Sequence, residues 1–235
     1  LGDYAFLGMT NAPVAAAEVT LDKTNFPYDT FRNYVKDSFD KDSDGVLSDS
    51  EIQMAKKIKL TGETDVALSD QSDKRRKLDI SGIQFLTHLR TVQISGWKLS
   101  GSDFSELTSL RKMDVCYDNL SELNISQMPD LEVLLCNDNR ISSLDISGNR
   151  KLKTLECCRN EISDLDVASH IQLERLRCND NHLKELKVGK LSELTNLACT
   201  GNRIEHLATA KLSKLQRLRC GYNRLKNLNI SNSRL

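Results

Sequence analysis

The sequence predicts a solenoid of stacked repeats, with a parallel β-sheet on its concave face, an irregular or 3-10 convex side and a small helical cap at its N-terminus. Three observations predict it. Leucines recur every 21 residues from Leu89 to Leu215, a short segment of alternating apolar and polar residues follows each of them, and an acidic loop between two helical patterns precedes them all. A fixed period of about 20 to 29 residues is typical of stacked units.

The composition limits the class of protein. The chain has 235 residues, of which 39% are hydrophobic, and its 33 basic and 33 acidic residues cancel. A neutral chain has no general attraction for nucleic acid or a membrane surface, and an aromatic content of 5% offers few platforms for stacking bases. No apolar run approaches the roughly 18 residues that a membrane helix needs. We therefore expect a globular protein with no nucleic-acid partner and no membrane span.

Residues 1–17 do not belong to the predicted fold. The segment AFLGMTNAPVAAAEV contains small residues of Ala-x-Ala character, similar to the tail of an export signal. The charged start and the full apolar stretch of such a signal are absent from this sequence. Two interpretations stay open for residues 1–17, the remnant of an export signal and a disordered N-terminal arm.

Residues 18–60 form the predicted helical cap. Apolar residues at helical spacing predict one helix from Tyr28 to Phe39 and a second from Ser48 to Ile58. Between them, residues 40–51 read DKDSDGVLSDSE, which matches the EF-hand calcium loop with Asp at positions 1, 3 and 5, Gly at 6 and Glu at 12. The expected Ca²⁺ ligands are the side chains of Asp40, Asp42, Asp44 and Ser48, the carbonyl of Val46 and both oxygens of Glu51.

This loop has two further predicted features and one alternative. Gly45 permits the sharp turn, and Leu47 supplies an apolar plug between the helices. Calcium sensors usually pair two such loops, whereas one is present here, so we expect a structural calcium that holds the cap against the first repeat. The alternative is an acidic surface turn that binds no metal. Residues 61–88 are expected to form an irregular first turn, in which the polar stretch from Thr61 to Lys77 is a loop insertion.

Residues 89–235 contain seven 21-residue repeats of the form L-x-x-L-x-C/I-x-x-N-x-I/L. One unit cannot bury its apolar face alone, so neighbouring units must stack. The repeats align an asparagine column of Asn139, Asn160, Asn181, Asn202 and Asn223, which Trp97 and Asp118 precede. We expect these amides to turn inward and to bond backbone groups of adjacent turns, because buried backbone groups need partners.

Five of the seven cysteines occupy a second column. These residues are Cys136, Cys157, Cys178, Cys199 and Cys220. Earlier repeats place Ile94 and Val115 in the same column, so we expect reduced, buried thiols that act as small hydrophobic side chains. Thiols in single file do not form the tetrahedral cluster that zinc requires.

Cys116 and Cys158 each follow that column by one residue and are expected to face outward on the concave side. They lie two repeats, or about 10 Å, apart, which is too far for a disulfide. A nucleophilic Cys158 is the enzymatic hypothesis, but no histidine is expected on its face.

No other catalytic signature is present. The sequence has no nucleophile elbow, HExxH motif, phosphate loop or GxGxxG fingerprint. The four histidines occupy different repeat positions and are expected to be ordinary surface residues: His88, His170, His182 and His206. The sequence therefore predicts that the protein is not an enzyme.

The outward strand positions form the expected binding surface, which is basic in its C-terminal half. The candidate partner-binding residues are Arg175, Arg177, Arg217, Arg219 and Tyr222. Arginine and tyrosine are the residue types that dominate binding hot spots. The alternative is that these side chains only solvate an exposed sheet.

Residues 89–235 resemble the leucine-rich-repeat superfamily. The segment NFPYDTFRNYVKDSFDKDSDGVLSDSEI, followed by SGIQFLTHL, is similar to the N-terminal region of bacterial internalin-like proteins of that superfamily, so the resemblance covers residues 20–235. It implies a secreted or cell-surface protein of the adhesion type that binds a protein or glycan of a host or bacterial surface. The stretch from Thr61 to Lys77 departs from the usual pattern. The repeats run to SNSRL without a polar cap, and the alternative function is a structural spacer in a larger bacterial surface protein.

Overall fold

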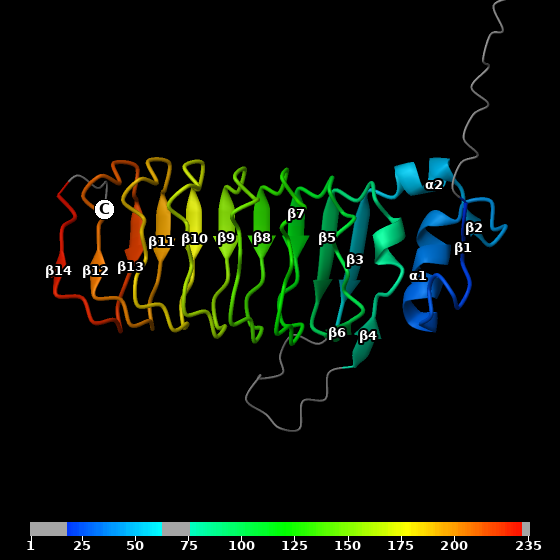
Figure 1. The fold of residues 1–235 in the computed structure, drawn as a ribbon, viewed down its shortest axis with the longest axis horizontal. Helices are drawn as coiled ribbons and strands as arrows, with labels where there is room; N and C mark the ends of the chain where they lie inside the picture. The colour runs from blue at the N-terminus through cyan, green and yellow to red at the C-terminus, as the bar shows by residue number, and fades with distance from the viewer. Residues whose placement is uncertain (1–17, 63–75, 232–235) are drawn as a thin grey trace, which may run out of the picture.

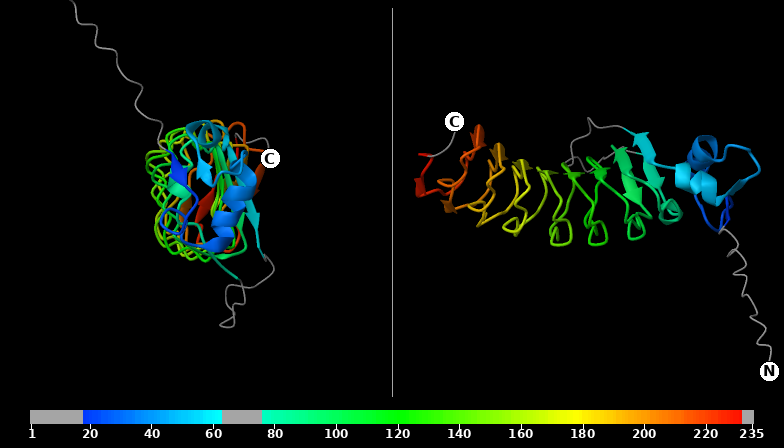
Figure 2. Two further views of the ribbon diagram at one scale, coloured as in Figure 1. Left: turned by 90° about the vertical axis from the view of Figure 1, so that its right-hand side faces the viewer. Right: turned by 90° about the horizontal axis from the view of Figure 1, so that it is seen from above.

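The computed structural model describes residues 18–62 and 76–231, so the segment 1–17 and its two interpretations lie outside the described residues. The described residues form one elongated stack of turns with a small helical unit at its N-terminal end (Figure 1). The strands of the main sheet lie along one side of the stack and the connecting turns along the other (Figure 2). The fold is the solenoid that the 21-residue period predicts, and the outward side of the main sheet is called the concave face below.

The main sheet contains eight parallel strands in the order β13-β11-β10-β9-β8-β7-β5-β3. Their bounds are β3 Lys57–Thr61, β5 Thr91–Ser95, β7 Lys112–Asp114, β8 Val133–Leu135, β9 Thr154–Glu156, β10 Arg175–Arg177, β11 Asn196–Ala198 and β13 Arg217–Arg219. From β5 to β13 each residue pairs with the residue 21 positions later, as Leu155 does with Leu176. The sequence period is therefore the register of the sheet.

Two short parallel strand pairs of the repeats lie beside the main sheet. They are β4 (Lys77–Asp79) with β6 (Lys98–Ser100), and β12 (His206–Leu207) with β14 (Asn227–Leu228). Both pairs are parallel and keep the 21-residue interval. The repeat therefore sets the register in this part of each turn as well.

Alternation along each short strand separates the core from the concave face. In β10 the central Leu176 is fully buried, whereas Arg175 and Arg177 on either side of it are partly exposed. Cys178 continues the alternation inward and is fully buried. Successive side chains of a strand point to opposite faces, so the thiol and the guanidinium of neighbouring residues lie on opposite sides of the sheet.

The cysteine column is a row of buried free thiols. Cys136, Cys157, Cys178 and Cys199 are buried and Cys220 is partly buried, all without disulfides. Burial raises the pKa of Cys199 to about 12 and raises the pKa of each of the other four above its ordinary value. The full burial of Cys136, Cys157, Cys178 and Cys199 in an apolar row agrees with small hydrophobic side chains, whereas Cys220 is partly exposed.

A pair of substitutions tests that interpretation. We expect Cys178→Val to change the free energy of unfolding by less than about 1.5 kcal/mol, because valine already occupies this column at Val115. Cys178→Ser should cost about 2 kcal/mol, because it buries a hydroxyl in an apolar row. Denaturant titration under reducing conditions measures both values. Equal costs for the two variants would contradict a hydrophobic role.

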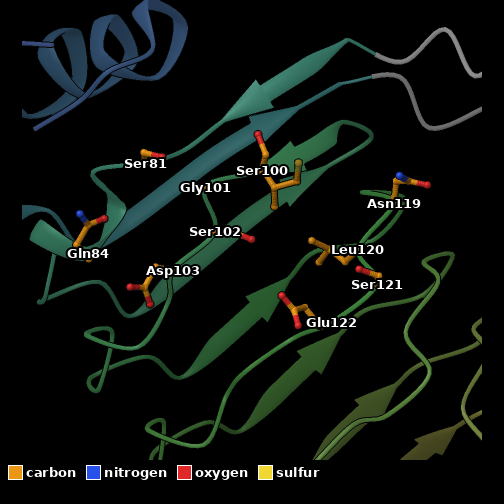
Figure 3. Close-up of a pocket in the computed structure, with 11 residues that line it drawn as sticks. Ser81, Gln84, Ser100, Gly101, Ser102, Asp103, Asn119, Leu120, Ser121 and Glu122 are labelled. Atoms are coloured by element: carbon orange, nitrogen blue, oxygen red, sulfur yellow. The ribbon is translucent and has the colours of Figure 1, made fainter. Parts of the chain in front are cut away.

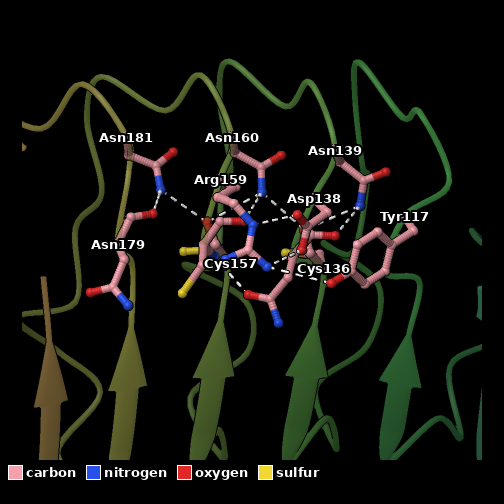
Figure 4. Close-up of polar contacts among 11 residues, drawn as sticks. Tyr117, Cys136, Asp138, Asn139, Cys157, Arg159, Asn160, Asn179 and Asn181 are labelled. Atoms are coloured by element: carbon pink, nitrogen blue, oxygen red, sulfur yellow. Dashed lines mark hydrogen bonds and ion pairs between the residues drawn. The ribbon is translucent and has the colours of Figure 1, made fainter. Parts of the chain in front are cut away.

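The asparagine column ties successive turns together, as Figure 4 shows for Asn139, Asn160 and Asn181. Asn181 Nδ2 donates to the carbonyls of Cys157 at 2.9 Å and Cys178 at 3.3 Å, and its Oδ1 accepts from the backbone N–H of Ile162 at 3.0 Å. The same pattern recurs in the other four members of the column. The inward-turning amides that the sequence predicts are confirmed.

The convex side consists of irregular turns, with one 3-10 helix at Ile83–Phe85. Each turn is closed by a backbone bond between residues three apart, such as Leu173 N–H to the His170 carbonyl at 2.9 Å. His170 is fully buried here, so the prediction that it is a surface residue is wrong. It occupies the inward position that Met128 and Asn149 hold in earlier turns, and its Nε2 lies 3.0 Å from the carbonyl of Ile146.

The N-terminal unit contains two helices, α1 (Asp29–Phe39) and α2 (Asp49–Met54). The second helix ends earlier than the sequence predicts, because Ile58 pairs with Val92 in the first strand of the main sheet. Phe26 contacts both Phe31 of α1 and Phe85 of the 3-10 helix, with ring centroids 6.1 and 5.8 Å apart. The helical unit thus covers the apolar end of the stack, where a solenoid needs a cap.

The first turn is longer than the others. Strands β3 and β5 pair Ile58 with Val92, an interval of 34 residues where the later strands have 21. Those 13 additional residues fall in the polar stretch where we predict a loop insertion. Residues 63–75 of that stretch lie outside the described residues.

Candidate functional site: the concave face and the acidic loop

The structure brings four predicted arginines together on the concave face. Arg175 and Arg177 lie on β10, and Arg217 and Arg219 lie on β13, with β11 between the two strands. The intervening strand β11 presents Asn196 and Ala198, which are shorter than their neighbours. The six residues surround a hollow of about 210 Å³.

The two arginine pairs have different electrostatic partners. Glu156 of β9 lies 3.8 Å from Arg175 and 3.4 Å from Arg177, measured between carboxylate oxygens and guanidinium nitrogens. No carboxylate in the described part of the chain lies within 4.0 Å of Arg217 or Arg219. The pair on β13 is therefore the part of the basic surface that is open to an external anion.

Tyr222 is not part of the hollow. It follows β13 in a left-handed backbone conformation with φ of 52°, and 89% of its surface is exposed. Its ring lies on the protein surface, where it can contact a partner, but it does not line the basic hollow. The sequence thus placed four of the five candidate residues in one site.

At the corresponding position of an earlier repeat, Tyr117 belongs to a polar network (Figure 4). Arg159 donates to both carboxylate oxygens of Asp138, and its Nη2 lies 3.5 Å from the hydroxyl of Tyr117. Hydrogen bonding to Asp138 raises the pKa of Arg159. This arginine is held by its own chain and is less available to a partner than those of β13.

The two cysteines expected on the concave face behave differently. Cys116 is partly exposed, whereas only 4% of Cys158 is exposed, so Cys158 is covered by its neighbours. Its backbone N–H donates to the side-chain oxygen of Asn137 at 2.7 Å. Burial raises the pKa of the Cys158 thiol, and a protonated thiol is a weak nucleophile. The structure thus gives no support to a catalytic Cys158.

In the acidic loop the structure gathers three carboxylates. One oxygen each of Asp40, Asp42 and Asp44 lies within 4.8 Å of the others. Asp40 Oδ1 is buried, and no donor among residues 18–62 and 76–231 bonds it. Although a backbone hydrogen bond from Asp44 lowers the pKa of Asp42, burial and repulsion from the neighbouring carboxylates outweigh it and raise that pKa. Clustered carboxylates with an unsatisfied buried oxygen fit a hard cation.

Two other predicted ligands are engaged at the beginning of α2. Ser48 and Glu51 form a capping box, in which the Ser48 N–H donates to Glu51 at 2.9 Å and the Glu51 N–H donates to the Ser48 hydroxyl at 3.4 Å. The other oxygen of Glu51 accepts from the Lys41 N–H at 2.6 Å. Burial raises the pKa of Glu51, but these bonds outweigh it and lower that pKa. The carboxylate is thus ionised and already holds the two ends of the loop together.

The loop is also stabilised by a strand that sequence reasoning missed. Strand β2 (Val46–Leu47) pairs antiparallel with β1 (Val19–Thr20). The Leu21 N–H adds a bond to the Gly45 carbonyl at 2.9 Å. Leu47 is fully buried, as the predicted apolar plug. Residues 19–20 carry no signal beyond one short β-branched pair, so only the fold could identify this partner.

A polar hollow of about 520 Å³ lies beside β6, and Figure 3 shows its lining. Serines dominate it, with the carboxylates of Asp103 and Glu122, and its lining residues in the described chain include no histidine, cysteine, lysine or arginine. Hydrogen bonds from Ser105 lower the pKa of Asp103, so that group is not poised as a general base.

Comparisons with known proteins agree with this architecture. No protein-family model and no curated protein matches the sequence. Among solved structures, internalin C2 from Listeria monocytogenes is similar with a TM-score of 0.74 and 20% identity, over 94% of this chain and 97% of that one. The functional domain of InlJ from Listeria monocytogenes, described as including a cysteine ladder, has a TM-score of 0.50 and 22% identity over 93% of this chain. The present chain covers 55% of that domain.

A plant protein shares part of the fold. The peptide hormone receptor RGFR1, solved in complex with RGF2, has a TM-score of 0.53 and 18% identity over 60% of this chain and 26% of its own. At such identities the likeness shows the fold. The described residues thus have the fold of a leucine-rich-repeat solenoid, similar to that of internalin C2. No helix among them has the length and apolar character to cross a membrane.

Proposed function

We propose that the protein is a recognition module that binds a macromolecular partner of a host or bacterial surface, outside the cell, through its concave face. The observation that carries this proposal is the basic hollow over β10, β11 and β13, where Arg217 and Arg219 have no acidic partner among the described residues. Arginines on a rigid sheet bind with little loss of conformational entropy, because the platform is already ordered. The similarity to internalin C2 and InlJ supports a role of this kind.

A binding screen with matched charge reversals tests the proposal. The parent protein is applied to arrays of purified extracellular host proteins, bacterial surface proteins and glycans. Substitution of both Arg217 and Arg219 by Glu should weaken the binding found there by at least about tenfold, because a like charge opposes the partner at the contact. Substitution of Arg150 and Arg203 by Glu is the control, because both residues are exposed and lie outside the strands. This double variant should bind the same partner as tightly as the parent protein does.

Two results would contradict the proposal. Equal losses in both double variants would indicate nonspecific charge attraction and not a site on the concave face. The absence of any bound partner would favour the alternative, in which the repeats act as a spacer within a larger surface protein.

We also propose that the loop of residues 40–51 binds a structural Ca²⁺. Asp40, Asp42 and Asp44 would supply side-chain oxygens and Val46 its carbonyl, while Ser48 and Glu51 would turn from their mutual bonds toward the ion. The carboxylate cluster and the unsatisfied Asp40 oxygen support this proposal. The ion would neutralise the repulsion within the loop and fix α1 and α2 over the end of the stack.

A further inference from the structure

The two arginine pairs of the concave face stand in equivalent positions of the repeat. Arg175 and Arg177 precede Arg217 and Arg219 by two full periods, and both pairs flank a central inward leucine. The two pairs differ in the neighbouring strand, which is β9 for the pair on β10 and β11 for the pair on β13. The group that the first pair binds therefore indicates which ligand the second pair can bind.

The first pair holds a carboxylate of its own chain. Glu156 on β9 lies directly opposite Arg177 in the sheet. One of its oxygens lies 3.8 Å from Arg175 and the other 3.4 Å from Arg177, so the carboxylate bridges the two guanidiniums. Its side chain is only 15% exposed. An arginine pair at this spacing on this sheet thus accommodates one carboxylate lying across it.

The second pair lacks that carboxylate. Ala198 on β11 lies directly opposite Arg219, in the position that corresponds to Glu156 two repeats earlier. Its methyl group cannot reach a guanidinium. The hollow of about 210 Å³ occupies the space where the carboxylate would lie, and Arg177 borders it from the other side.

We propose that this hollow is a receptor site for a carboxylate of an acidic peptide segment in the partner, bound above Ala198 in the place that Glu156 takes on the first pair. This inference rests on the proposed function of the concave face and names the chemistry that the face recognises. The planar fork of arginine matches a carboxylate with two parallel bonds. Within the chain, Glu156 lies between two guanidiniums, with a hydrogen bond of 3.4 Å from Arg177 and an ion pair of 3.8 Å with Arg175.

The lining favours a peptide over a sugar. Among the described residues, four arginines, one asparagine and one alanine form it, and none of these offers an aromatic face against which a saccharide ring could pack. Side chains two residues apart in an extended peptide lie on one side, about 6.6 Å apart. The same spacing separates Arg217 from Arg219 along β13, so an extended acidic peptide can follow the pair.

A defined probe tests the site. The probe is a fluorescent peptide of alternating glutamate and glycine, with a glutamine counterpart as its control, measured by fluorescence anisotropy at low salt. Ala198→Glu supplies the missing carboxylate from within the chain and should weaken peptide binding by about tenfold or more, as expected for charge-assisted hydrogen bonds. Ser192→Glu introduces the same charge at an exposed position outside the strands and should change binding by less than about twofold.

Two further variants separate the loss of peptide binding from a distortion of the sheet by the Ala198→Glu side chain. Arg217→Gln combined with Arg219→Gln should lower the affinity for the glutamate peptide similarly. Ala198→Gln fills the same space without charge, and the Glu variant should melt at a higher temperature than the Gln variant because only glutamate pairs with the arginines.

Three outcomes would overturn the inference. They are equal binding of the glutamate and glutamine peptides, unchanged binding in the Ala198→Glu and Arg217/Arg219→Gln variants, and binding of heparin without binding of the peptide, which would assign the hollow to a sulfated glycan. If a macromolecule from the arrays still requires Arg217 and Arg219 in any of these cases, the proposed function stands and only the carboxylate inference fails.

Discussion

Replacing Asn181 by alanine should lower the free energy of unfolding by about 3 kcal/mol. The Asn181 side chain is buried and bonds the carbonyls of Cys157 and Cys178 and the N–H of Ile162. Alanine provides neither donor nor acceptor, so the Ile162 N–H is left buried without its partner. A buried backbone group that loses its only bond costs more than the mean value of a hydrogen bond.

Denaturant titration followed by circular dichroism measures this loss. Asn196→Ala is the matched control, because it makes the same chemical change at a partly exposed position of β11. That variant should stay within about 0.5 kcal/mol of the parent. A comparable cost for both variants would show that the asparagine column does not hold adjacent turns together. Each turn contacts only its neighbours, and a turn in the middle of the stack has a neighbour on both sides. The loss of unfolding free energy should therefore be largest for an asparagine in the middle of the stack.

Saturating calcium should raise the melting temperature by roughly 5 to 10 °C over the value in chelator. A ligand that binds only the folded state contributes about 2.7 kcal/mol when its free concentration is 100 times its dissociation constant. For a chain of this length, 1 kcal/mol corresponds to about 2 to 4 °C. Differential scanning calorimetry in calcium and in chelator makes the comparison, and identical curves would exclude a structural calcium.

Substitution of Asp42 by asparagine separates calcium binding from loop stability. The amide keeps an oxygen for the Asp44 N–H, which lies 3.3 Å away, and removes one charge from the cluster. Without calcium this variant should be at least as stable as the parent, because like-charge repulsion falls. With calcium it should be less stable, because a ligand charge is lost. Asp37→Asn, on the exposed side of α1, should leave the calcium response unchanged.

The sequence by itself determined the repeat register and therefore the two sides of the sheet. One apolar residue type recurring every 21 positions can be buried in only one alignment of the turns. That alignment places Leu176 and Cys178 inside and Arg177 outside, as the structure has them. The same alignment places His170 in the inward column of Asn149, and Ala198 in the column of Glu156.

Only the tertiary structure decided how individual side chains meet across neighbouring strands and loops. The burial of Cys158, the capping box of Ser48 and Glu51, and the pairing of residues 19–20 with the acidic loop depend on local packing. A period assigns a residue to a face, but it does not fix where a long side chain lies on that face. The carboxylate of Glu156 reaches both arginines of β10, whereas the methyl group of Ala198 reaches neither arginine of β13, and this difference in reach creates the basic hollow.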